Sequence, residues 1–192
     1  ISDKDLLQIF IDLAEQLSLE RYGHGGFKEE NFVVMRTPSR AFHAEIIDRD
    51  IHADISKKGY FSATTRGYKI RTKIGEISEF SAINSILKDE TLNSREKMTA
   101  TKYRLKKLDV YAFGVCMARI MSSHALFSCS QAEIHAFKKS MRGDDFLAHE
   151  PLETLEEILQ RNPSMSNSDF FEQIFTLIKR MLQPPQQRHI IM

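Results

Sequence analysis

Hydrophobic residues recur at helical spacing near the start of the chain. In residues 3–20, leucine, isoleucine and phenylalanine return every three or four positions, and Ser2 followed three residues later by Asp5 is a helix-capping pattern. We therefore predict an amphipathic helix over residues 3–20. Gly23 and the glycines after it are predicted to end this helix, because glycine favours loop conformations.

Two short apolar runs follow this first helix. Residues 32–35 and 43–47 flank a turn that contains Pro38, and such a pattern is typical of two antiparallel strands. We predict a β-hairpin here. Its strands would bring Asn31, just before the first strand, next to Asp48, just after the second.

The rest of the chain has mainly helical patterns. Residues 76–87 have apolar positions at helical spacing, whereas residues 89–100 are polar and are predicted to form a loop. Residues 106–122 are apolar on nearly all sides, as in a helix buried in a core. A further helix is predicted to begin at Ser168 and to stop before Pro184. Two shorter helices are predicted over residues 130–141 and 152–160.

The composition favours one folded domain over residues 1–192, mainly α with one short β-hairpin. Of the 192 residues, 42% are hydrophobic and 28% are charged, which is enough for one sizeable core. The formal charge of +1 predicts no nucleic-acid partner. Because no run approaches the roughly 20 apolar residues that span a bilayer, no transmembrane segment is predicted. The start at Ile1, without initiator Met or signal peptide, leads us to expect a piece of a longer protein.

Several common site signatures are missing from the sequence. The two cysteines, Cys116 and Cys129, have neither the density of a disulfide scaffold nor the spacing of a zinc site, so both are predicted to be free thiols. The seven histidines are dispersed and do not predict a metal centre. No hydrolase nucleophile motif, Walker loop or dinucleotide glycine motif occurs.

The segment 22–34 decides how the function is interpreted. Residues 24–31 read His-Gly-Gly-Phe-Lys-Glu-Glu-Asn, and this resembles the catalytic loop of protein kinases, His-Arg-Asp-Leu-Lys-Pro-Glu-Asn. Four positions match the family's pattern, namely His24, Lys28, Glu30 and Asn31. Gly25 replaces the arginine, and Gly26 replaces the aspartate that serves as the general base. The resemblance therefore implies a kinase-like loop without its catalytic base.

Four further segments resemble kinase motifs in the family's order. Residues 44–50 are similar to the strand that ends in Asp-Phe-Gly, and residues 65–72 to the Thr-Arg-Gly-Tyr run that leads to Ala-Pro-Glu. Residues 108–115, Leu-Asp-Val-Tyr-Ala-Phe-Gly-Val, resemble the start of the central buried kinase helix and are the most specific match. Residues 177–184 are similar to the family's last conserved segment.

The resemblance spans nearly the whole chain and implies the carboxy-terminal lobe of a kinase-like domain. The amino-terminal lobe, which supplies the glycine-rich loop and a strand lysine in active kinases, is absent from this chain. The implied parts are a catalytic-loop region at 22–34, an activation-segment-like region at 48–72, an insertion at about 73–105 and a central helix at about 106–122.

The resemblance also implies a vestigial cofactor site. Lys28, Asn31 and Asp48 stand where the family holds nucleotide and metal. The side-chain oxygens of Asn31 and Asp48 suit magnesium, but two ligands without nucleotide phosphates make a poor site. The alternative is that Asn31 caps a turn and that Asp48 bonds nearby backbone.

Other residues have structural roles in the family. Its central helix begins with an aspartate that anchors the catalytic loop, so Asp109 is expected to accept hydrogen bonds near His24. Arg188 matches an arginine that pairs with the Glu of Ala-Pro-Glu, but Thr72 stands at that position. Arg49 replaces the apolar Phe of Asp-Phe-Gly, and a guanidinium cannot be buried without partners. The apolar stack that aligns an active kinase is therefore expected to be broken.

Together these departures predict a pseudokinase, a catalytically impaired domain that acts through protein binding, scaffolding or allosteric regulation. No cofactor is predicted apart from residual binding of ATP and magnesium. The loop variant and the enlarged region before the central helix are also similar to the rhoptry kinases and pseudokinases that apicomplexan parasites secrete. This similarity implies a host-facing location and a protein partner, such as an active kinase or a host protein.

Two alternatives stay open. One is an active or atypical Ser/Thr kinase whose amino-terminal lobe is missing from this chain. The other is a helical interaction domain unrelated to kinases, in which Asp109 would lie far from His24.

Overall fold

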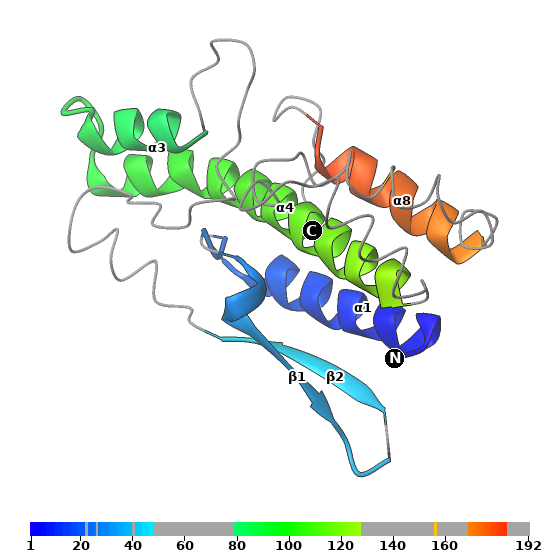
Figure 1. The fold of residues 1–192 in the computed structure, drawn as a ribbon. Helices are drawn as coiled ribbons and strands as arrows, with labels where there is room; N and C mark the ends of the chain where they lie inside the picture. The colour runs from blue at the N-terminus through cyan, green and yellow to red at the C-terminus, as the bar shows by residue number, and fades with distance from the viewer. Residues whose placement is uncertain are drawn as a thin grey trace.

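The computed structural model describes residues 1–47 apart from 22, 26 and 40, then residues 79–127, residue 156 and residues 169–183. The described elements, in chain order, are α1 (Asp3–Leu19), the 3-10 turn η1 (Glu29–Asn31), β1 (Phe32–Arg36), β2 (Phe42–Ile46), α3 (Glu79–Lys88), α4 (Ser94–Phe127) and α8 (Asp169–Met181). The predicted class, mainly α with one β-hairpin, is confirmed for these residues. The helices lie along one another, and the hairpin projects from them on the side of α1 (Figure 1).

Helix α1 begins where the sequence predicts. The Ser2 side chain accepts the Asp5 N–H and the Asp5 carboxylate accepts the Ser2 N–H, so both halves of the capping box are present. The helix ends at Leu19, with the Glu20 N–H donating to the Leu17 carbonyl. The predicted helix over residues 3–20 is therefore confirmed to within one residue, and the loop that contains Gly23 and Gly25 follows its end. The buried residues of α1 are Leu6, Ile9, Phe10, Asp12, Leu13 and Leu17.

The β-hairpin is confirmed to within one residue at each strand end. Strands β1 and β2 pair antiparallel, with Phe32 opposite Ile46 and Val34 opposite Ala44. The Thr37 N–H closes the turn by donating to the Ala41 carbonyl at 2.8 Å. In β2, Ala44 and Ile46 are buried toward α1.

Helix α4 is the longest element, with 34 residues, and the prediction missed its beginning. Residues 89–100 were predicted to form a loop, but α4 begins at Ser94. Asn93 and Glu96 form a reciprocal cap, in which the Asn93 side chain accepts the Glu96 N–H and the Glu96 carboxylate accepts the Asn93 N–H. This cap starts a polar helix that the apolar pattern alone does not reveal. Helix α3, predicted over residues 76–87, occupies Glu79–Lys88.

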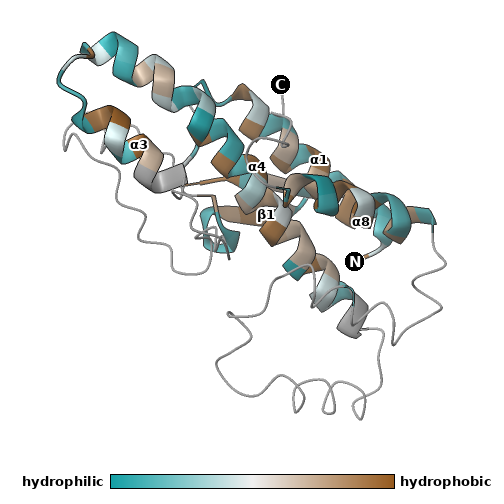
Figure 2. Ribbon diagram, turned by 90° about the horizontal axis from the view of Figure 1, so that it is seen from above, coloured by the Kyte–Doolittle hydropathy of each residue, from teal (hydrophilic) through white to brown (hydrophobic). Residues whose placement is uncertain are grey.

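The second half of α4 forms the centre of the core. Helix α3 packs against α4, as does α8. Hydrophilic colour predominates over the first turns of α4 in Figure 2, whereas its later residues are buried among the other elements. Gly114 allows α8 to approach closely, because a Cβ at this position would lie only 2.8 Å from the Cβ of Met181. The predicted central helix is therefore present, and it is longer at both ends than residues 106–122.

Helix α8 (Asp169–Met181) matches the helix predicted after Ser168, although that capping residue is not described. Cys116 is buried in α4, and the prediction that both cysteines are free thiols stays a prediction because Cys129 is not described. Burial raises the pKa of the Cys116 thiol well above its ordinary value. Cys129, the helices predicted over residues 130–141 and 152–160, and the activation-segment-like region 48–72 lie outside the described residues, apart from residue 156.

Candidate functional site

The candidate site is the loop that joins α1 to β1, and α4 holds this loop through one buried carboxylate. Asp109 is only 4% exposed. Its Oδ2 accepts the His24 N–H at 2.5 Å, and its Oδ1 accepts the Gly25 N–H at 2.7 Å. The partners are 84 and 85 residues apart in the chain. The expected contact between Asp109 and the backbone near His24 is confirmed.

The loop passes so close to α4 that it requires glycine at position 23. Gly23 has a φ of 85°, which side-chain-bearing residues rarely adopt. A Cβ there would lie 2.8 Å from the Asp109 Oδ2 and 3.0 Å from backbone atoms of Leu105 and Lys106. Gly25 also has a positive φ, of 74°. The glycines of this segment therefore shape the loop around the carboxylate.

The electrostatic state of Asp109 is unusual for an aspartate. Burial raises its pKa to about 7 and outweighs the hydrogen bonds from Gly25 and His24, which favour the ionised form. The nearby Glu20 charge raises the pKa further, and Lys106 opposes that effect. Near neutral pH the anchor between loop and helix therefore exists in both protonation states.

Aromatic contacts fix the same loop to the core. The buried His24 ring meets Phe27 edge-on with centroids 6.1 Å apart, and Phe27 stacks on Phe32 at 5.9 Å. Phe27 also meets Phe113 of α4 edge-on at 5.7 Å. The His24 Nε2 lies 3.4 Å from the Ile47 carbonyl oxygen. The side chain at position 24 thus connects the loop to the end of the hairpin.

The predicted cofactor residues are only partly described. The Asn31 N–H donates to the Lys28 carbonyl at 3.0 Å, and the Ile47 N–H donates to the Asn31 carbonyl at 2.8 Å. Asn31 is buried, and the residue after Ile47 is Asp48. Since Asp48 lies outside the described residues, the pairing of Asn31 with Asp48 stays a prediction.

Gly26 and Arg188 also lie outside the described part of the chain. Where the structure describes the chain, no group of three or more His, Cys, Asp or Glu side chains could hold a metal ion. The magnesium site predicted from Asn31 and Asp48 is not tested by that observation, because Asp48 was not included in it.

A second connection between the loop and α4 escaped the sequence reasoning. The Arg119 Nη1 lies 3.5 Å from the Glu29 Oε1, and both side chains are partly buried. The only hint in the sequence was a single arginine within the otherwise apolar residues 110–121 of this helix. This ion pair connects η1 to α4 at a point nearly three helical turns beyond Asp109.

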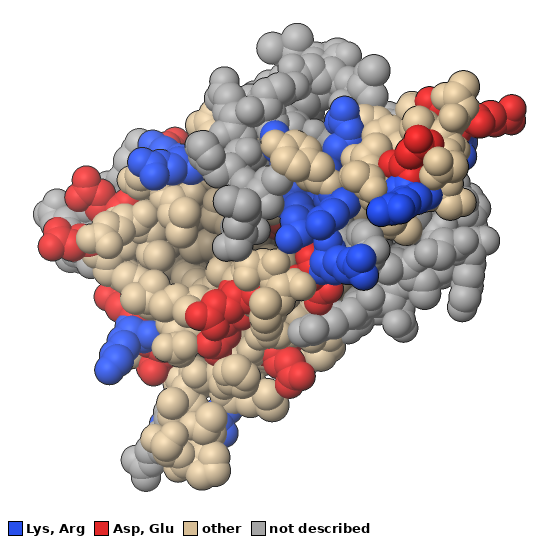
Figure 3. Space-filling model, turned by 180° about the vertical axis from the view of Figure 1, so that it is seen from behind, with Lys and Arg blue, Asp and Glu red and all other residues tan. Residues whose placement is uncertain are grey.

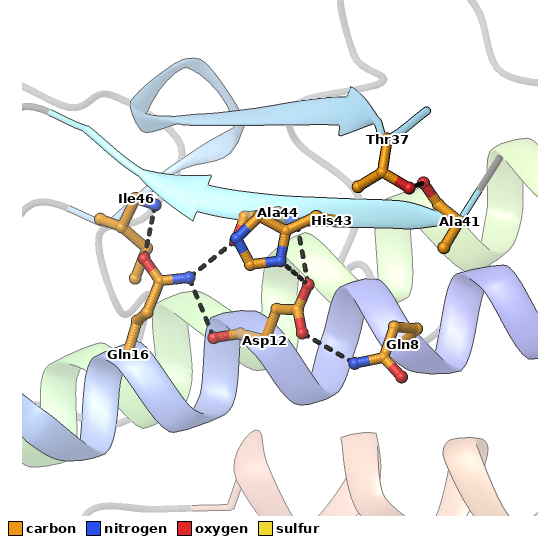
Figure 4. A network of polar contacts seen from close by, with 8 residues as sticks. All are labelled: Gln8, Asp12, Gln16, Thr37, Ala41, His43, Ala44 and Ile46. Carbon is orange, nitrogen blue, oxygen red and sulfur yellow. Dashed lines mark hydrogen bonds and ion pairs between the residues drawn. The ribbon is translucent and has the colours of Figure 1, made fainter. Parts of the chain in front are cut away.

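A second polar network, also unforeseen, joins α1 to β2 (Figure 4). The Asp12 Oδ2 accepts the Ala44 N–H at 2.9 Å and lies 2.8 Å from the His43 Nδ1. The Gln16 side chain donates to the Ala44 carbonyl at 2.7 Å and accepts the Ile46 N–H at 2.9 Å. Because the Gln16 amide both donates and accepts, it replaces the peptide group of a neighbouring strand. The sequence carries no local signal for these contacts.

The pKa of Asp12 is shifted in the opposite direction to that of Asp109. Burial opposes ionisation of Asp12, but the hydrogen bonds from Ala44 and Gln8 and the charge of His43 together lower its pKa below 3.8. Asp12 is therefore a carboxylate throughout the neutral pH range.

The described residues on the face shown in Figure 3 have no single sign of charge. Lys and Arg side chains and Asp and Glu side chains both occur on the face shown in Figure 3. This agrees with the formal charge of +1 for the whole chain.

Comparisons of the chain with protein-family models, with curated proteins and with solved structures find no match in any of the three. The kinase resemblance therefore rests on the motifs in the sequence. Among the helices in the described ranges, none is both long and apolar enough to cross a membrane.

Proposed function

We propose that the chain is the carboxy-terminal lobe of a pseudokinase that acts as a protein-binding scaffold or allosteric regulator. The observation that carries the proposal is the pair of hydrogen bonds from the His24 and Gly25 N–H groups to Asp109. The kinase resemblance requires the catalytic-loop-like segment 22–34 to contact the central-helix motif at 108–115. A chance match of the two motifs would not require it.

The same contact supports loss of catalysis. A kinase base must accept the proton of a substrate hydroxyl, so its carboxylate has to face the substrate. Gly26 has no such group. Asp109 is the carboxylate that binds the loop, but it is buried and both of its oxygens already accept backbone N–H groups. It is therefore suited to holding the loop and unsuited to serving as a replacement base.

An active or atypical kinase is the second candidate, and Asp48 with Asn31 would be its metal ligands. Its support is the close pairing of the strand ends, where the Ile47 N–H donates to the Asn31 carbonyl and Asp48 follows directly. The third candidate, an unrelated helical interaction domain, is disfavoured by the contact between Asp109 and His24.

A nucleotide titration separates the first two candidates. Thermal unfolding of the longest soluble form of the protein is measured with ATP, alone and with magnesium or manganese, beside an assay for phosphate transfer. We expect no metal-dependent rise in melting temperature and no transfer. The Asp48→Asn variant is compared with Asp169→Asn, a matched change at an exposed position on α8. A clear metal-dependent shift with phosphate transfer that only Asp48→Asn abolishes would refute the pseudokinase proposal.

A further inference from the structure

The two long edges of the hairpin differ in how their backbone groups are satisfied. On β2, the Ala44 N–H and carbonyl and the Ile46 N–H are bonded by the Asp12 and Gln16 side chains of α1. Figure 4 shows β2 lying between α1 and β1. Helix α1 therefore closes one edge of the sheet, and β1 forms the other edge.

The backbone of β1 has an outward-facing row of donors and acceptors. Because the groups of Ala44 and Ile46 turn toward α1, the pairs Val34 with Ala44 and Phe32 with Ile46 are of the non-hydrogen-bonded type. The N–H and carbonyl groups of Phe32, Val34 and Arg36 thus point away from β2. The sheet has two strands, and within the described residues no third strand pairs with β1.

The side chains of β1 make this edge suitable for pairing with another strand. Val33, Val34 and Met35 are 39%, 42% and 42% exposed. The strand has a single charge, on Arg36, and contains neither proline nor lysine. Exposed apolar edge strands without such blocking residues readily pair with further strands.

We propose that β1 is a self-association edge, which pairs antiparallel with β1 of a second copy about a two-fold axis at Val34. This register overlaps all five residues of the strand. Val34 then faces its own equivalent, Val33 faces Met35 of the second copy, and Phe32 faces Arg36 of the second copy. The two hairpins form one four-stranded sheet.

The sequence of β1 is complementary to itself in this register. No like charges face each other, because Arg36 meets an aromatic ring across the axis. Arg36 already lies over the Phe42 ring of its own copy, 5.7 Å from the centroid, so a second ring gives its guanidinium aromatic contact on both sides. A strand of another protein would have to supply this complementarity independently. The proposal does not depend on the kinase resemblance, since it uses only the hairpin and α1.

Site-specific disulfide formation tests both the interface and its register. Val34→Cys is compared with Met35→Cys, each in a Cys129→Ser background, at equal concentration with oxidised glutathione as the oxidant. Both positions are equally exposed, and the remaining Cys116 is buried. Facing residues of a hydrogen-bonded antiparallel pair have Cα atoms about 5.5 Å apart, within the range that a disulfide spans. We expect Val34→Cys to form disulfide-linked dimers at least about tenfold faster than Met35→Cys, whose two copies would be diagonal neighbours.

Sedimentation of the unmodified chain gives the second measurement. Because a strand edge is a small interface, we expect dimerisation to appear only as the concentration rises from about 1 μM to about 500 μM. Val34→Lys should abolish it, since two ammonium groups would face each other across the axis. A chain that stays monomeric throughout this range, or equal disulfide rates at positions 34 and 35, would overturn the proposal.

Discussion

Two aspartates hold distant segments of this chain together, and they do so in opposite electrostatic states. Asp109 on α4 holds the loop between α1 and β1, and Asp12 on α1 holds β2. Asp109 accepts two backbone N–H groups, Asp12 accepts one, and each is largely buried. Yet the pKa of Asp109 is raised to about 7, whereas the pKa of Asp12 is lowered.

The difference follows from what surrounds each carboxylate. Asp109 is enclosed in the core with only two backbone donors, so burial prevails. Asp12 lies near the surface, beside a His43 side chain that is 51% exposed, and it also accepts the Gln8 amide. A buried carboxylate that accepts backbone N–H groups can therefore stabilise the fold at low pH, as Asp109 does, or at neutral and high pH, as Asp12 does.

The largest effect should come from the titration of Asp109. Its folded pKa of about 7 lies above its ordinary value of 3.8, so the folded state binds an extra proton between these values. The associated stability is fully present below pH 3.8 and is lost as the pH rises through 7. Urea unfolding should show the stability of the native chain relative to Asp109→Asn falling by on the order of 4 kcal/mol across this window. A difference that stays constant with pH would contradict the account.

Gly23→Ala should destabilise the loop contact by about 3 kcal/mol at any pH. The new methyl group has to adopt a positive φ and overlaps backbone atoms of α4 that cannot move independently. The free energy of unfolding, measured with urea, gives the magnitude. If the substitution proves neutral, the loop does not pass as close to Asp109 as the structure places it.

Gln16→Ala should weaken the contact between α1 and β2 and lower the free energy of unfolding by about 2 kcal/mol. It leaves the buried Ala44 carbonyl and Ile46 N–H without their side-chain partner. Gln8→Ala on the same helix is the matched control, because Gln8 is exposed and, among the described residues, its amide bonds the Asp12 side chain and no backbone group of β2. We expect the control to lose less than about 1 kcal/mol in the same unfolding assay. Equal losses would show that the edge of β2 is not held through Gln16.

The smallest effect should be the pH dependence of Asp12. Because its folded pKa is below 3.8, its stability contribution is present above that pH and is lost as the pH falls through the folded pKa. The native chain should therefore lose stability relative to Asp12→Asn only in acid, by about 1 kcal/mol. Acid unfolding curves of the two proteins supply the comparison, and a loss that occurs on raising the pH would have the wrong sign.

Local patterns in the sequence predicted the elements well. The helical spacing and the cap at Ser2 gave α1, and two apolar runs around a proline gave the hairpin. The start of α4 was missed because its first turns are polar, although Asn93 and Glu96 carried a usable capping signal. The contact between Asp109 and His24 followed from the motif resemblance.

Contacts between distant segments were predictable only where a motif supplied them. Nothing near Gln16 in the sequence shows that its amide meets β2, since that depends on how α1 and the hairpin are placed in space. The pKa of Asp109 likewise depends on depth of burial, which no local pattern encodes. The ion pair of Arg119 with Glu29 belongs to the same class.

The most direct test of the account is a pH titration of the two aspartate carboxyl carbons by NMR, assigned with the Asp109→Asn and Asp12→Asn variants. If α4 holds the kinase-like loop through a buried carboxylate, the Asp109 signal titrates near pH 7, the His24 and Gly25 amide signals shift with it, and the Asp12 signal titrates below 3.8. If both signals titrate together near the ordinary value of 3.8 and the two amides do not respond, the loop is not anchored in this way. The proposal of a pseudokinase lobe would then lose its main support.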